Sequence, residues 1–75
     1  MIHYTPLWNT MKEKSETTYT LRNKGISSST IKNLKDGQPV STYTIDRLCM
    51  ILNCDILDII AYTPDETSRA PEQAP

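Results

Sequence analysis

One stretch of the chain, TYTLRNKGISSSTIKNLKDG (residues 18–37), constrains the fold most. A short helical run over residues 19–24 is followed by Gly25, and glycine adopts the left-handed conformation that ends many helices without a steric penalty. The hydroxyl of Ser27 or Ser28 can then cap a second helix. The stretch therefore predicts two short helices joined by a tight turn.

The apolar residues of this stretch are spaced so that two helices crossing at a steep angle bury them together. They are Leu21, Ile26, Ile31 and Leu34. The side chains left outside are short or form hydrogen bonds, and they are Ser27, Ser28, Ser29, Lys32 and Asn33. Such side chains let a helix approach another surface closely, as a helix-turn-helix that reads DNA must do. The plainer alternative is a helix with a capped start and a solvated outer face.

Upstream of this stretch the sequence predicts a first helix. Thr5 can cap it, and the proline that follows fits the first helical position because its missing N–H would be unpaired there anyway. The helix should run to about Lys14. Its apolar face is made by Leu7, Trp8 and Met11, all of which we expect to contribute to the core.

Three further helices are marked by their ends. We expect Thr18 to cap the second helix of the chain and the third helix to span residues 28–35, ending at Asp36-Gly37. Ser41 or Thr42 should cap a fourth helix. Its amphipathic stripe, at positions i, i+3, i+4 and i+7, consists of Ile45, Leu48, Cys49 and Leu52.

Residues 55–62 predict a fifth helix, which Asp55 caps. It is apolar on more than one side, through Ile56, Leu57, Ile59, Ile60 and Tyr62. Residues 65–75 contain no large apolar residue and should form a disordered, acidic, proline-containing tail. No confident strand is predicted, although residues 1–4 could be an extended lead-in or an edge strand. The expected fold class is thus all-α, a compact five-helix domain over residues 1–64.

The charge is unevenly distributed along the chain. The net charge is −1, but residues 1–40 carry six basic and three acidic residues (+3), whereas residues 41–75 carry two basic and six acidic residues (−4). The basic excess lies in the half that contains the two-helix unit, which suits an acidic partner such as DNA, although small proteins often have uneven halves by chance.

Several other functions are disfavoured by composition. The single histidine, the two glycines and the absence of a phosphate-binding glycine loop argue against an enzyme, a cofactor or a small-molecule substrate. Cys49 and Cys54 are too few for a disulfide framework or a four-ligand zinc site, so we interpret them as reduced, semi-buried side chains. No segment is long and apolar enough for a membrane span and no signal pattern opens the sequence, so we expect a cytoplasmic protein.

Four short motifs, in order, resemble the lambda-repressor/Cro-like (XRE) family of bacterial and phage helix-turn-helix regulators. They are Gly25-Ile26-Ser27, Asp36-Gly37, the segment STYTIDRLC at residues 41–49, and LNCDILDII at residues 52–60. The similarity extends over residues 1–64. The sequence departs from the family pattern at Leu21, where a small residue is usual, and at Ser28, where glutamine is frequent.

The resemblance implies roles for individual residues. The recognition helix would be residues 28–35, with base-edge contacts from Ser27, Ser28, Ser29, Lys32 and Asn33. Phosphate contacts would come from Thr18, Lys35, Gln38, Thr42 and Tyr43. The implied function is that of a sequence-specific transcriptional regulator, a repressor, that binds double-stranded DNA.

A single module of this size would bind DNA weakly, so we expect a homodimer on two half-sites. The candidate dimer surface is the apolar last segment, with Ile56, Ile59 and Ile60, which could equally close the core of the monomer. The alternative function is a protein-interaction module with a helix-turn-helix fold, such as an antitoxin-like or anti-repressor subunit. The acidic C-terminal half would then carry the partner surface.

Overall fold

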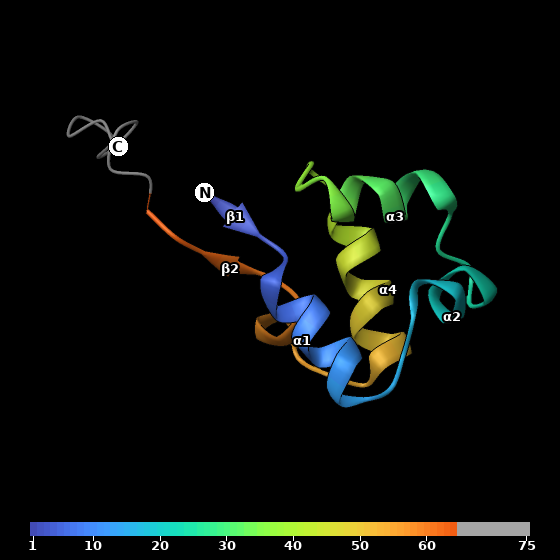
Figure 1. Ribbon diagram of the computed structural model, residues 1–75. Coiled ribbons are helices and arrows are strands. Elements are labelled where there is room, and N and C mark those ends of the chain that lie inside the picture. The colour runs from blue at the N-terminus through green and yellow to red at the C-terminus, as the bar shows by residue number, and fades with distance from the viewer. Residues whose placement is uncertain (65–75) are drawn as a thin grey trace.

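The computed structural model describes residues 1–64, in which helices pack around a small core beside a two-stranded sheet (Figure 1). The helices are α1 (Thr5–Glu13), α2 (Thr18–Asn23), α3 (Ser28–Lys35) and α4 (Thr42–Leu52), followed by the 3-10 helix η1 (Ile56–Asp58). The strands are β1 (Ile2–His3) and β2 (Ala61–Tyr62). The predicted fold class, an all-α helix-turn-helix domain, is confirmed. The tail predicted over residues 65–75 lies outside the described residues.

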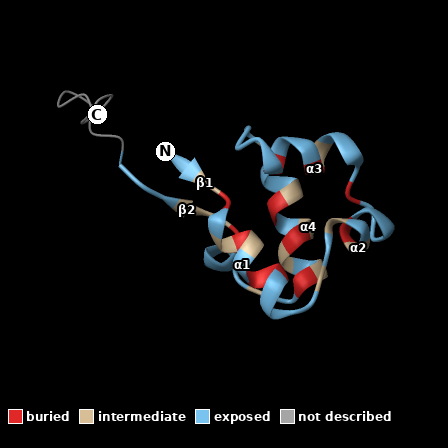
Figure 2. Cartoon of the chain, in the orientation of Figure 1, coloured by how far each residue is buried: buried red, intermediate tan, exposed pale blue. Residues whose placement is uncertain are grey.

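The core lies where α1, α2, α3 and α4 turn their apolar sides toward one another (Figure 2). Its most completely buried side chains are Leu7, Leu21, Leu34, Leu48 and Ile59. All four apolar residues that the sequence placed between the two central helices are buried: Leu21, Ile26, Ile31 and Leu34. Trp8 and Cys49 are half-buried and pack against the margin of this core.

Hydroxyl caps fix where three of the helices begin. The backbone N–H groups of residues 20, 30 and 44 donate to the hydroxyls of Thr17, Ser27 and Ser41 at 3.3, 3.2 and 3.1 Å. Each pair is three residues apart, the spacing at which a side chain replaces the missing helical acceptor. Of the two capping residues considered for each helix, the structure therefore has Ser27 for α3 and Ser41 for α4.

Two predicted caps are wrong by one residue. Thr18 is the first residue of α2 and its neighbour Thr17 caps the helix. Thr5 is already helical, and the preceding residue, Tyr4, occupies the cap position of α1 without a side-chain hydrogen bond. The hydroxyl of Thr5 lies instead 3.1 Å from Nδ1 of His3, so a local side-chain contact has taken the place of the cap.

The predicted fifth helix does not form. After Asn53, whose positive φ of 52° ends α4, the chain makes only the short η1, and its next residues become β2. The strand pairs antiparallel with β1, with Ile2 opposite Tyr62 and His3 opposite Ala61. Pairing of β1 with β2 gives hydrogen-bond partners to backbone groups of both strands. If residues 55–62 formed a helix instead, the backbone groups of β1 would lose these partners.

Contacts between distant segments hold this C-terminal corner against α1. The hydroxyl of Thr10 donates to the carbonyl oxygen of Asp58 at 2.8 Å, and Ile59 is completely buried beside it in the chain. Ile59 therefore belongs to the core of the monomer. It is not available for the dimer surface that the sequence also suggested for this segment. Ile60 is half-buried, whereas Ile56 and Leu57 are 51% and 78% exposed.

Candidate nucleic-acid interface

The turn between α2 and α3 is fixed by a glycine and an arginine. Gly25 has φ = +107°, a conformation that residues with a side chain rarely adopt. Its place at the end of a helix predicted such a conformation. Nη2 of Arg47, from α4, donates to the carbonyl oxygen of Lys24 at 2.9 Å. A Cβ on Gly25 would lie 3.0 Å from the same guanidinium nitrogen. No local pattern of residues predicts this long-range contact, which ties the turn to α4.

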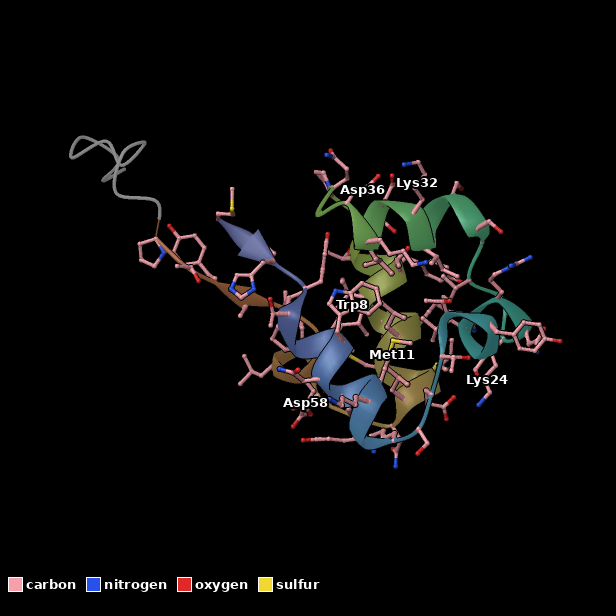
Figure 3. All side chains as sticks on the ribbon, in the orientation of Figure 1. Trp8, Met11, Lys24, Lys32, Asp36 and Asp58 are labelled. Carbon is pink, nitrogen blue, oxygen red and sulfur yellow. The ribbon has the colours of Figure 1, made fainter. Side chains whose placement is uncertain are left out.

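The residues of α3 divide into an anchored side and an open side. Ile31 and Leu34 are buried, whereas the five residues predicted to read base edges are all exposed: Ser27, Ser28, Ser29, Lys32 and Asn33. Lys32 projects from the outer side of α3 together with Asp36 (Figure 3). The outer side of the helix therefore consists of exposed polar side chains.

The hydroxyls at the start of α3 differ in how far they are already engaged. Oγ of Ser27 accepts from the backbone of Thr30 and lies 3.2 Å from the hydroxyl of Ser29. It also donates to the hydroxyl of Thr30 at 2.9 Å. Ser28, by contrast, extends from the first turn of the helix as an exposed residue. Because Ser27 holds the helix start, Ser28 and Ser29 are the better placed to approach a ligand.

Lys32 forms an ion pair within its own helix. Its Nζ lies 2.7 Å from Oδ2 of Asp36, and the two side chains are 75% and 47% exposed. The hydrogen bond that the Lys32 ammonium donates to Asp36, and then the charge of that carboxylate, raises the pKa of Lys32, so this group carries its positive charge throughout the physiological pH range. An exposed pair of this kind can exchange partners at small cost.

The predicted phosphate contacts lie in two places beside α3. Thr18, half-buried, and Lys35, exposed, border a hollow of about 360 Å³ between α2 and α3. Gln38, Thr42 and Tyr43 lie beyond the end of α3 and at the start of α4, and all three are exposed. The hydroxyl of Tyr4 donates to the carbonyl oxygen of Gln38 at 2.7 Å and so fixes that loop to the N-terminal segment.

Sequence reasoning missed one basic residue of this surface. Arg22, an exposed residue of α2, lines the same hollow as Thr18, Ser28 and Lys35. Its position one turn after Thr18 on a six-residue helix could have indicated a shared face. Three cations therefore gather around the hollow, those of Arg22, Lys32 and Lys35, together with the carboxylate of Asp36.

Acidic residues gather at the opposite end of the molecule. Glu13, Asp55 and Asp58 line a second hollow, with Lys14 as the basic residue among them, and Asp58 lies far from Lys32 in the view of Figure 3. Carboxylates thus outnumber the one lysine in this hollow, whereas cations outnumber the one carboxylate in the hollow beside α3. Within residues 1–64 no three His, Cys, Asp or Glu side chains are grouped so that they could hold a metal ion.

The surroundings of both cysteines disfavour the thiolate form. Both are half-buried free thiols at the end of α4. Burial, and then nearby negative charge, raises the pKa of Cys49; burial, and then the neighbouring Cys49, raises that of Cys54. A raised pKa keeps a thiol protonated at neutral pH, and the protonated form is a poor nucleophile and metal ligand.

Within residues 1–64, no helix is long and apolar enough to cross a membrane.

A tight turn, a capped second helix with an uncovered polar side, and basic side chains around it define a helix-turn-helix DNA-binding domain. Residues 6–65 match the sequence profile of the Cro/C1-type helix-turn-helix DNA-binding domain, so the chain belongs to this family. The resemblance found in the short motifs is confirmed.

A solved structure agrees with this assignment. The fold is similar to the crystal structure of the transcriptional regulator VanUg, form II, with a TM-score of 0.77 and 29% sequence identity. The similarity covers 85% of this chain and 87% of that one, so it extends to nearly the whole of both proteins. No curated protein sequence matches the chain.

Proposed function

We propose that this protein is a sequence-specific transcriptional regulator, acting as a repressor, that inserts α3 into the major groove of double-stranded DNA. The observation that carries the proposal is the division of α3: buried Ile31 and Leu34 fix the helix to the core, while the other side is polar and uncovered. The family assignment and the similarity to a transcriptional regulator support it.

The proposed base contacts come from Ser28, Ser29, Lys32 and Asn33, with Ser27 mainly holding the start of the helix. A lysine can donate to the acceptors of a guanine edge, an asparagine can pair with adenine, and serine serves either. Phosphates on either side would meet Lys35 and Arg22 near α2, and Gln38, Thr42 and Tyr43 beyond α3, with Thr18 at the margin. Phosphate contacts set the register of α3, and base contacts supply the selectivity.

We further propose that the protein acts as a homodimer. One module of this size buries roughly 600–1,000 Å² on DNA, and a second half-site about 34 Å away would supply the remaining affinity. Of the predicted dimer residues, Ile56 and Ile60 are accessible enough to contact a second copy, whereas Ile59 is not. Repression would follow if the dimer occupies DNA that the transcription machinery needs.

A paired substitution on α3 tests the function directly. Replacing Ser29 and Lys32 together (Ser29→Ala, Lys32→Gln) should weaken binding to a selected DNA site by at least about tenfold, because two groups that face the groove are lost. The matched control is Lys12→Gln, which removes the same charge from an exposed position on α1. Binding is measured by fluorescence anisotropy, and circular dichroism verifies that each variant is folded.

The alternative function is a protein-interaction module, such as an antitoxin-like or anti-repressor subunit. The exposure of Ile56 and Leu57, beside the acidic Asp55 and Asp58, favours it. If the paired substitution leaves DNA binding equal to that of Lys12→Gln, the assigned reading face is wrong. Complete lack of DNA binding by the folded wild-type protein would favour the alternative.

A further inference from the structure

One acidic side chain stands among the basic groups beside α3. The hollow between α2 and α3 is lined by Thr18, Arg22, Ser28, Ile31, Lys32, Lys35 and Asp36. Asp36 is its single carboxylate, and its Oδ2 lies 2.7 Å from Nζ of Lys32. Both side chains project outward from α3, on the side proposed to face DNA (Figure 3).

This ion pair contributes little to the stability of the domain. The pair is exposed, and exposed pairs at i,i+4 stabilise a helix only slightly. Asp36 is also the C-cap of α3, where the partial negative charge of the helix end disfavours a carboxylate. An uncharged side chain would suit that position as well or better. Asp36 therefore matters more for the charge of the surface beside α3 than for the stability of the helix.

We propose that Asp36 limits the sequence-independent affinity of this protein for DNA by holding the Lys32 ammonium in an ion pair. The inference rests on the proposed function. For Lys32 to contact a phosphate it must leave Asp36. Breaking that ion pair costs free energy that the new contact must offset, so Lys32 adds little to the sequence-independent affinity.

Removing the carboxylate should therefore convert Lys32 into an effective phosphate contact. For Asp36→Asn, we expect binding to a short duplex of mixed sequence to be roughly two- to fivefold tighter, the range that the breaking of an exposed ion pair allows. The slope of log affinity against log salt should become steeper by about 0.9, because one more counterion is released.

The matched control is Glu13→Gln, which changes the net charge equally at the acidic end of the molecule. A second control is Lys32→Gln, alone and combined with Asp36→Asn, because the neutral side chain leaves Asp36 no ammonium to hold. If Asp36 acts through Lys32, the gain from Asp36→Asn should largely disappear in the Lys32→Gln background. Thermal unfolding should show Asp36→Asn to be at least as stable as wild type.

The outcomes separate this inference from the proposed function. A gain confined to Asp36→Asn and dependent on Lys32 supports the inference. A gain equal to that of Glu13→Gln, or one that persists without Lys32, overturns it while DNA binding by the wild-type protein still stands. If neither the wild type nor Asp36→Asn binds the duplex at low salt, both the inference and the proposed function are wrong.

Discussion

Single residues at the ends of helices set the geometry of the surface that we propose faces DNA. Gly25 ends α2 with φ = +107°, and Gly37 follows α3 with φ = +73°. The two differ in their surroundings, since a Cβ on Gly25 would crowd the guanidinium of Arg47 and one on Gly37 would meet nothing within 4 Å. Substitutions at these two glycines therefore distinguish the cost of a strained backbone, present at both, from the cost of a steric clash, present only at Gly25.

We predict that Gly25→Ala destabilises the domain more than Gly37→Ala. The strained backbone alone should cost about 1–2 kcal/mol at either position. At Gly25 the displaced Arg47 would also lose its hydrogen bond to Lys24, which adds about 0.5–1.5 kcal/mol. The free energy of unfolding, measured by urea denaturation, tests the difference. Equal losses in the two variants would show that Arg47 does not hold the turn.

At the scale of the elements, the sequence predicted the central helices far better than the chain ends. The span of α3 is correct to the residue because local signals fix both ends: the hydroxyl of Ser27 and the glycine at position 37. The last segment carried no such periodic signal, and its conformation depends on pairing with residues almost sixty positions earlier. Long-range pairing of two-residue strands cannot be derived from local propensity.

The same distinction holds for the candidate site. The exposed positions of α3 followed from the spacing of Ile31 and Leu34, which any amphipathic reading reveals. Arg47 was missed because its contact with Lys24 depends on how α4 packs against the turn. Arg22 was missed although its i,i+4 spacing from Thr18 is local. The ion pair between Lys32 and Asp36 was within reach of the sequence, since its i,i+4 spacing is local.

Neighbouring serines in the first turn of α3 should separate folding from binding. We predict that Ser27→Ala lowers the free energy of unfolding by about 1 kcal/mol, because it removes the cap of the helix. Ser28→Ala should leave stability almost unchanged and weaken binding to a selected DNA site. Thermal unfolding and anisotropy titrations on both variants provide the measurements. A stability loss at Ser28 as large as that at Ser27 would contradict the assigned cap.

At the scale of the whole molecule, opposite charges lie at opposite ends. The basic groups of Arg22, Lys32 and Lys35 surround α3. The acidic hollow of Glu13, Asp55 and Asp58, which also contains Lys14, lies between the end of α1 and the segment that follows α4. A protein with a net charge of −1 can therefore still orient one face toward DNA. This separation explains why the total charge is a poor guide to the partner of this domain.

Sequence-specific DNA binding is best tested by selection from a library of random DNA duplexes, followed by a salt titration on the enriched sequence. We expect enrichment of one short motif, repeated as a palindrome if the protein is dimeric, with log affinity falling steeply against log salt. The Ser29→Ala, Lys32→Gln variant should lose this enrichment. No enriched motif at low salt, with the wild-type protein folded by circular dichroism, would contradict sequence-specific DNA binding.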